Sequence, residues 1–431
     1  MNTAVMLDHL RTHRTPLVLS RAGVVAWDDA ELHRGAYAAD PEGYALLALV
    51  PGVHEQQRAR VLLQILAASR AGMGEGSREI LEKSTRALLF GLPPVLVVTV
   101  LLALRRMRVN NKHVTRAVVA FVLDHPESEE IIVARHPALV DCFEHALGKA
   151  TARGCARLIA EGELDSAELH RKLLRFSANP AAASERVRAL YRPGTYGAPL
   201  PRQPIAPLEA VREREPVVTT TSRGDIAATL VHVYRGGPVA ELRPALAGYV
   251  AAATRDLPRL AGHVALMLDG SDSMRGYGDR EWALLSQAEA LRLVLAQVCE
   301  RLTVVEVGAG QTGPTDLAVG LLDALDAAPD LVAIVTDGYE NRLPGDLARV
   351  VETLRYIEVR TPIVLCRATF TGSDALALRD PAPALPAHGF WHQDDFAALL
   401  PWLFAHCPPG AAWIRATALR FLANRMEGAI H

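Results

Sequence analysis

A loop of small polar residues follows a short apolar stretch in the second half of the chain. Residues 264–268 have the length and composition of a buried strand, and Asp269, Ser271 and Ser273 come directly after it. One carboxylate and two hydroxyls at alternate positions are hard oxygen ligands of the kind that Mg²⁺ or Mn²⁺ prefers. Serine-rich turns after strands also cap the next helix, so this motif alone does not distinguish a cation site from a helix cap.

Two later segments supply further oxygen ligands. Thr315 lies near the expected N-terminus of a helix, and Asp337 follows an expected strand over residues 331–336. The carboxyl ends of parallel strands meet at one edge of a sheet, which is where such folds bind their ligands. We therefore expect one site for Mg²⁺ or Mn²⁺, formed by Asp269, Ser271, Ser273, Thr315 and Asp337.

The chemistry of this site favours binding over hydrolysis. The three motifs contain no His, Cys or Lys that could act as a base or nucleophile. Two carboxylates and three neutral hydroxyls leave a divalent cation incompletely neutralised, so one coordination position can accept an acid from a partner. The additional carboxylate of Asp272 would weaken this capture if it faced the ion, and would only add to surface acidity if it faced solvent.

The pattern Asp-x-Ser-x-Ser, followed by a Thr and then by Thr-Asp-Gly, resembles the metal-ion-dependent adhesion site of von Willebrand factor A domains. All five ligand positions match in order, and the resemblance covers about residues 262–406. It implies that Ser271, Ser273 and Thr315 bind the ion directly or through water. It also implies that Asp269 and Asp337 balance its charge, often through water.

The surrounding sequence predicts a doubly wound, Rossmann-like α/β fold for this part of the chain. Only about a dozen residues, 302–313, separate the second strand from the Thr315 loop, where the von Willebrand A family has an additional edge strand. Either that edge is trimmed or the second strand is misplaced, which leaves the strand order open. The expected strands are 264–268, 302–307, 331–336 and 362–366, and the expected helices are 281–300, 315–327, 345–356 and 395–405.

The first half of the chain has the apolar periodicity of helices, separated by Gly and Pro. Helices joined by short loops predict an all-α solenoid of stacked antiparallel pairs, similar to HEAT repeats, although no fixed sequence period is present. The expected helices are 44–50, 56–69, 77–90, 94–106, 112–123, 137–160 and 166–176.

These patterns divide the chain into five segments. The predicted divisions are a helical domain over 1–190, a Pro-rich linker or strap over 191–222, helices over 223–260 that complete the first domain, an α/β domain over 261–408, and a C-terminal helix over 409–431.

Basic residues gather at one expected helix junction. This basic cluster, which consists of Arg105, Arg106, Arg108, Lys112, His113 and Arg116, could contact the phosphates of a nucleic acid. The alternative is that Arg105 and Arg106 complement a helix C-terminus and are otherwise solvated. Residues 1–260 carry an excess of six positive charges and residues 261–431 an excess of eight negative charges.

The domain order, helical array first and von Willebrand A domain second, resembles the Ro/TROVE family of proteins that bind small noncoding RNAs. That resemblance implies a ribonucleoprotein scaffold rather than an enzyme, with RNA bound by the helical domain. The alternative is a protein-interaction adaptor whose ion captures an acidic residue of a partner, such as the MoxR-type AAA+ ATPases with which bacterial von Willebrand A proteins often work.

Composition favours a globular cytoplasmic protein. Half of the 431 residues are hydrophobic and 22% are charged. No signal peptide or stretch long enough to span a membrane is recognisable, so we expect no membrane partner. Five scattered cysteines, Cys142, Cys155, Cys299, Cys366 and Cys407, favour neither a disulfide framework nor a zinc site.

Overall fold

The computed structural model describes most of the chain outside residues 126–223. The described ranges are 1–20, 24–109, 111–125, 224–308, 315–340, 342–372 and 379–427, with isolated residues between 171 and 218. The helices expected over 137–160 and 166–176, and the linker expected over 191–222, lie almost wholly outside them. The chain divides into two compact units, residues 1–210 with 418–431, and residues 211–417.

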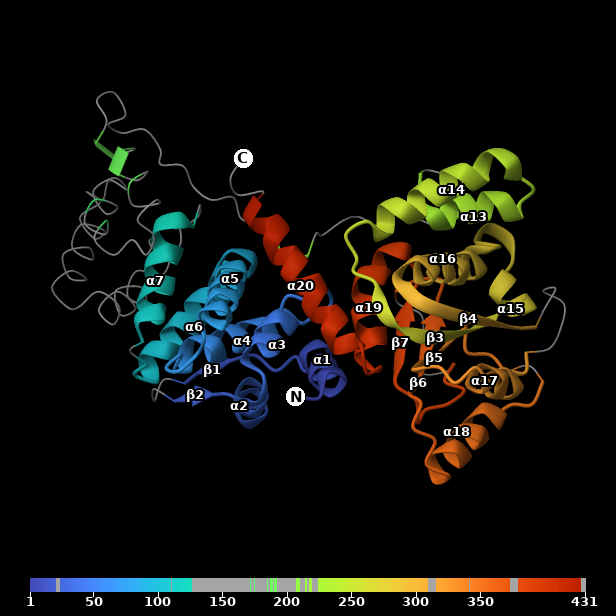
Figure 1. Ribbon diagram of the computed structural model, residues 1–431, viewed down its shortest axis with the longest axis horizontal. Coiled ribbons are helices and arrows are strands. Elements are labelled where there is room, and N and C mark those ends of the chain that lie inside the picture. The colour runs from blue at the N-terminus through green and yellow to red at the C-terminus, as the bar shows by residue number, and fades with distance from the viewer. Residues whose placement is uncertain are drawn as a thin grey trace. The chain divides into compact units, whose positions relative to one another are not determined.

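The described part of the first unit is mainly helical, as expected (Figure 1). Its central helix is α4, which packs against the helices before and after it. All residues from Val61 to Leu66 are buried, and Gln64 is the only polar one among them. Two short strands pair antiparallel beside these helices. The elements are α1 (Thr3–Thr12), β1 (Val18–Leu19), β2 (Val25–Ala26), α2 (Ala30–Ala39), α3 (Pro41–Leu47), α4 (Glu55–Ala67), α5 (Glu75–Gly91), α6 (Pro94–Arg106) and α7 (Lys112–Asp124).

The second unit contains a five-stranded parallel sheet in the order β4-β3-β5-β6-β7 (Figure 1). Helices α17 and α18 cover one face, and α16 covers the other with α13 and α14 outside it. The elements are α13 (Ile226–Tyr234), α14 (Val239–Thr254), β3 (Leu260–Asp269), α15 (Asp272–Arg275), η2 (Gly278–Arg280), α16 (Ala283–Val298), β4 (Cys299–Val307), α17 (Leu317–Asp326), β5 (Leu331–Thr336), α18 (Asp346–Tyr356), β6 (Ile363–Ala368), β7 (Ala387–Phe390), η4 (Gln393–Asp395) and α19 (Phe396–Ala405). The last helix, α20 (Gly410–Glu427), begins in the second unit, and its residues from 418 onward belong to the first.

The sheet settles the strand order that the short 302–313 segment left open. The second strand, β4, forms as expected and pairs with β3, and no strand lies on its other side in the described part of the unit. Strand β4 is therefore an edge of the sheet that the described residues form. Strands β3 and β5 are central, and both are almost wholly apolar because helices cover both of their faces.

The expectation that residues 223–260 complete the first domain is wrong. Helices α13 and α14 pack on α16 in the second unit. Ile226, Leu230 and Val231 are buried there, and the backbone N–H of Ile226 donates a hydrogen bond to the Gln393 side chain at 3.0 Å. An apolar helix face shows that a helix must be covered, but it does not show which domain covers it.

Two expectations from composition concern cysteines and membrane spans. Cys299, Cys366 and Cys407 are free and buried. Burial raises the pKa of Cys366 to about 12, which disfavours its reactive thiolate. Among the described residues, no helix combines the length and the apolar character required to cross a membrane.

Helix α17 approaches the sheet closely at Gly320. A Cβ atom there would lie 2.4 Å from Val307 Cγ2 and 2.8 Å from Met267 Sδ. We expect Gly320→Ala to lower the free energy of unfolding by about 1–3 kcal/mol, because the sheet side chains must move. The matched control is Gly248→Ala in α14, where a Cβ would meet nothing within 4 Å. We expect this control to raise the stability by about 0.5–1 kcal/mol in urea titrations. Equal effects of the two substitutions would contradict the close packing.

Candidate metal centre

The ends of two central strands bring the predicted ligands together. Leu268 of β3 pairs with Val335 of β5, so the next residues, Asp269 and Thr336, end their strands at the same level. Asp337 follows Thr336 directly. The ends of parallel strands therefore place both carboxylates at one edge of the sheet, as the sequence predicted.

Hydrogen bonds fix Asp269 at the end of β3. The Thr336 hydroxyl donates to Asp269 Oδ2 at 2.7 Å, and the Ser271 N–H donates to Asp269 Oδ1 at 3.0 Å. The hydroxyl oxygens of Ser271 and Ser273 are 3.1 Å apart. Three of the predicted ligands are therefore held in one hydrogen-bonded loop. Thr336, which the sequence analysis did not select, orients the first of them.

Ionisation of the Asp269 carboxylate carries an energetic cost. Asp269 is 0% exposed. Burial raises its pKa, and hydrogen bonds from Thr336, Ser271 and Thr315 offset this increase only in part. The described residues thus offset only part of the cost of burying a negative charge on Asp269. A cation bound beside this carboxylate would stabilise its charged form.

Asp337 is under the same constraint. Burial is the main cause of its raised pKa, and the negative charge of Asp269 raises it further. The Tyr339 N–H, the Ser273 hydroxyl and the positive charge of Arg379 act in the opposite direction. Because Asp337 interacts with both Asp269 and Ser273, the two strand ends form one site.

Thr315 adds a buried hydroxyl oxygen to this site. Its side chain is 1% exposed and lowers the pKa of Asp269, which places the two groups near each other. Within the described part of the chain, however, the Thr315 hydroxyl makes no hydrogen bond of normal geometry. A buried hydroxyl is expected to be satisfied. Two buried carboxylates and a buried hydroxyl that lacks a hydrogen bond of normal geometry with the described residues therefore fit a divalent metal ion that binds oxygen.

Asp272 does not share this environment. It begins the short helix α15 and is exposed, whereas its neighbours Ser271 and Met274 are buried. Its charge therefore adds to the acidity of the surface around the site rather than to the buried pair.

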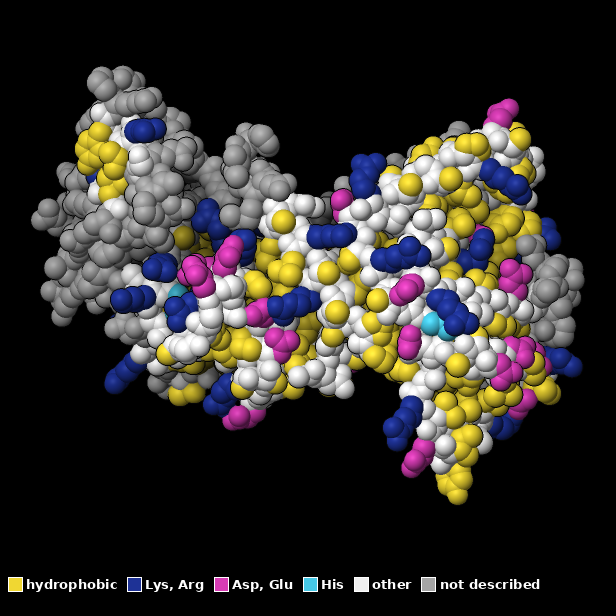
Figure 2. All heavy atoms as spheres, in the orientation of Figure 1, with side chains coloured by type: hydrophobic (Ala, Val, Ile, Leu, Met, Phe, Trp, Pro, Cys, Tyr) yellow, Lys and Arg dark blue, Asp and Glu magenta, His cyan; other side chains and the backbone are white. Residues whose placement is uncertain are grey.

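Several residues of the basic cluster also contact other elements of the first unit. Arg106 donates to the Ser20 carbonyl at 2.8 Å, His113 Nε2 lies 2.8 Å from the Leu66 carbonyl oxygen, and Arg116 pairs with Glu82 at 3.3 Å. At least three of the six cluster residues are therefore partly engaged within the protein. Figure 2 shows several Lys and Arg side chains over the α7 part of the first unit, and the exposed members of the cluster are Arg106, Arg108, Lys112 and Arg116.

Comparisons with known proteins do not assign this chain to a family. No protein-family description matches it, and no curated protein is significantly similar to it in sequence.

The Thr336 hydroxyl supports both the carboxylate and the turn that follows it. It donates to Asp269 and accepts a hydrogen bond from the Gly338 N–H at 3.0 Å. Thr336→Val would leave both partners buried without this hydroxyl, so we expect a loss of about 1–3 kcal/mol in the free energy of unfolding. Thr336→Ser keeps the hydroxyl and should retain most of that stability. Equal losses for the two variants in urea denaturation would show that the hydroxyl is not responsible.

Proposed function

We propose that this protein is a non-enzymatic binding scaffold whose second unit is a von Willebrand A domain. It binds Mg²⁺ or Mn²⁺ through Asp269, Ser271, Ser273, Thr315 and Asp337, and the ion holds a carboxylate of a protein partner. The observation that carries this proposal is the convergence of two buried carboxylates with the buried hydroxyl of Thr315, which makes no hydrogen bond of normal geometry with the described residues.

The ligand set supports binding of an acidic partner. Mg²⁺ takes six oxygens in octahedral geometry and usually retains some of its water. Three hydroxyls and two carboxylates that act partly through water leave room for one external oxygen. A partner's Asp or Glu is a suitable ligand because, where Asp269 and Asp337 act through water, it would supply the carboxylate oxygen that binds the ion directly.

Two aromatic side chains near the ligands support a protein partner. Tyr277, a few residues after Ser273, is 88% exposed, and Tyr339, two residues after Asp337, is 47% exposed. The Arg379 guanidinium lies over the Tyr339 ring, 5.4 Å from its centroid. Tyr and Arg are the residues that most often dominate protein interfaces. A MoxR-type AAA+ ATPase remains our candidate for the partner.

Metal binding gives a direct test. Wild-type protein should bind Mg²⁺ or Mn²⁺ in isothermal titration calorimetry and unfold at a higher temperature when either ion is present. We expect Asp269→Ala and Thr315→Val each to weaken binding by at least about tenfold, because each removes an oxygen ligand or its support. The matched control is Asp272→Ala, which removes an exposed carboxylate from the same loop and should leave the affinity nearly unchanged.

Equal losses for Asp272→Ala and Asp269→Ala would indicate nonspecific attraction to an acidic surface and would contradict the site. The same variants serve in affinity purification with Mg²⁺ or with EDTA. Capture of a protein that requires Mg²⁺, survives Asp272→Ala and is lost in Asp269→Ala supports the adaptor function.

A second candidate function, binding of small noncoding RNA by a HEAT-like first unit, is favoured by Arg108 and Lys112. Both side chains are exposed, and the structure gives neither an ion pair within the described residues. Such cations can approach phosphates without breaking existing contacts.

The double charge reversal Arg108→Glu/Lys112→Glu tests this function. We expect it to weaken RNA retention in filter-binding assays and to flatten the dependence of affinity on salt, because fewer counterions are released. The control Arg235→Glu/Arg243→Glu changes the net charge equally at exposed residues of the second unit and should have little effect. If both pairs weaken binding equally, the effect is one of overall charge.

A further inference from the structure

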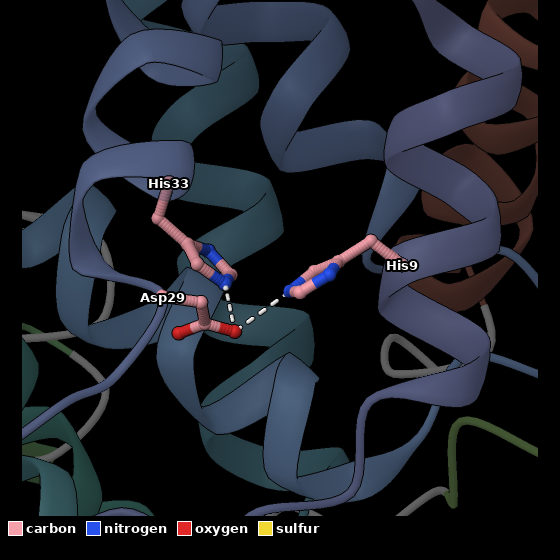
Figure 3. Close-up of side chains that lie close together, drawn as sticks. All are labelled: His9, Asp29 and His33. Atoms are coloured by element: carbon pink, nitrogen blue, oxygen red, sulfur yellow. Dashed lines mark hydrogen bonds and ion pairs between the residues drawn. The ribbon is translucent and has the colours of Figure 1, made fainter.

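Three histidines surround one carboxylate in the first unit. His9 lies on α1 and His13 caps the end of that helix, so their four-residue spacing places both on one face. His33 lies in α2, and Asp29 precedes that helix as its N-cap. Figure 3 shows the rings of His9 and His33 converging on the Asp29 carboxylate from two elements.

The three imidazole rings lie around the same carboxylate oxygen atom. The Nε2 atoms of His9, His33 and His13 lie 2.7, 3.3 and 3.6 Å from Asp29 Oδ2. Adjacent ligand atoms in a tetrahedral zinc site lie about 3.3 Å apart, since each bond to the metal is about 2.0–2.1 Å long. The contacts of His9 and His33 with Asp29 match this spacing closely, whereas His13 Nε2 lies nearer to Asp28 Oδ2, at 3.0 Å, and must turn from it to reach the same ion.

We propose that His9, His13, His33 and Asp29 form a binding site for a divalent transition-metal ion, most suitably Zn²⁺. Imidazole nitrogens with one carboxylate select Zn²⁺ and its neighbours in the first transition row over Mg²⁺. This ligand chemistry separates the site from the all-oxygen site at the edge of the sheet.

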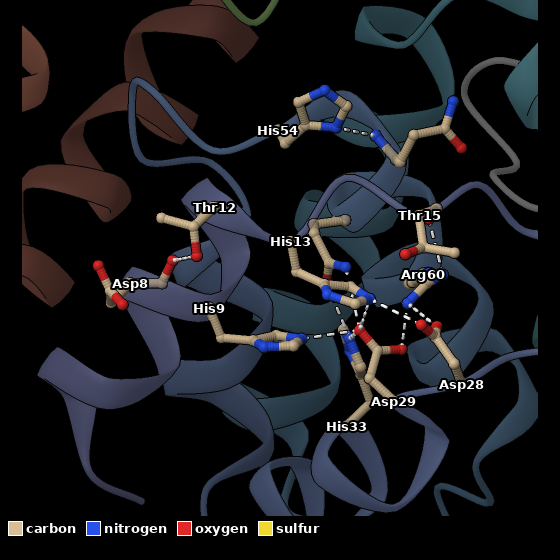
Figure 4. Close-up of polar contacts among 12 residues, drawn as sticks. Asp8, His9, Thr12, His13, Thr15, Asp28, Asp29, His33, His54 and Arg60 are labelled. Atoms are coloured by element: carbon tan, nitrogen blue, oxygen red, sulfur yellow. Dashed lines mark hydrogen bonds and ion pairs between the residues drawn. The ribbon is translucent and has the colours of Figure 1, made fainter.

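Surrounding residues hold the ligands in the required orientation. The Tyr44 hydroxyl lies 2.6 Å from His33 Nδ1, the nitrogen that faces away from Asp29. Arg60, which is fully buried, pairs with the other Asp29 oxygen, Oδ1, and with Asp28 Oδ1 at 2.8 Å (Figure 4). Partners of this kind orient metal ligands in known sites. Asp29 Oδ2 is thereby left to the histidines and Gln57.

The charge of the cluster suits a cation. Burial alone would raise the pKa of Asp29, but hydrogen bonds from His33, His9, Gln57 and Arg60 hold it well below its usual range. The carboxylate is therefore ionised. Arg60 offsets one of the two negative charges of Asp28 and Asp29, and one remains for a metal ion.

Four protein ligands make this a structural site. A tetrahedral zinc ion with four protein ligands has no open position for a substrate. Its bonds link the end of α1 to the start of α2, so part of the metal-binding free energy would stabilise the fold of the first unit.

Cobalt titration of the full-length chain tests the proposal. The protein is first treated with a chelator and then supplied with excess Mg²⁺ to occupy the oxygen site. Wild type should bind one Co²⁺ per chain with the intense visible absorption of tetrahedral coordination, and Zn²⁺ should displace it. We expect His9→Ala/His13→Ala to abolish that absorption and to weaken Zn²⁺ binding by at least about tenfold.

The control variant is His54→Asn. His54 lies outside the cluster and caps α4 by accepting a hydrogen bond from the Gln56 N–H, a role that Asn can retain. This variant should bind Co²⁺ like wild type. His9 and His13 are partly exposed, at 21% and 28%, so their replacement should preserve the fold, and circular dichroism checks this.

Three results would overturn the proposal. The first is the absence of tetrahedral Co²⁺ absorption in wild type, which would make the cluster a hydrogen-bonded ion-pair network only. The second is unchanged absorption in the double variant. The third is an equal loss in His54→Asn. If the double variant fails to fold, His13→Ala alone replaces it, and wild-type affinity in that variant would exclude His13 as a ligand.

Discussion

The burial of Asp269 and Asp337 at the same sheet edge is the constraint on which the second unit depends. Both residues follow central strands whose apolar side chains must be covered by helices on both faces, so their carboxylates have little access to water. Each charge raises the energetic cost of the other. The neighbouring donors compensate only part of this cost, and a divalent cation would supply the remainder. The packing that builds the sheet would thus also create the affinity for a metal ion that we propose.

Most of this α/β fold could be predicted because its signals are local. The four expected strands and four expected helices form within a few residues of their expected limits, since each combines an apolar run with a clear break. Strand β7 was missed: Ala387–Phe390 is only four residues long and contains His and Gly, so it lacks an apolar run. The prediction that α13 and α14 complete the first domain was also wrong. The sequence of these two helices does not show that they are buried by α16, which follows them in the chain.

The difference between local signals and contacts between distant residues also explains which site residues the sequence revealed. Asp269 and Asp337 could be placed together because strand ends in a parallel sheet share an edge. Thr336 was overlooked because its side chain acts on Asp269, 67 residues earlier. For the histidine cluster, the only sequence signal was the spacing of His9 and His13. Nothing local to Asp29 indicated that a buried Arg60 would hold one of its oxygens and leave the other for the imidazoles.

The two sites differ in what they leave for an external ligand. At the sheet edge, the proposed hydroxyl and carboxylate ligands would leave one coordination position of an oxygen-binding cation open, so an acid from another protein could complete the coordination. Around Asp29, three imidazoles and a carboxylate would fill a tetrahedral shell by themselves. The first arrangement makes binding of a partner depend on the metal, whereas the second makes the local fold depend on it. On the proposed coordination, the oxygen site would serve recognition of a partner and the imidazole site would stabilise the fold.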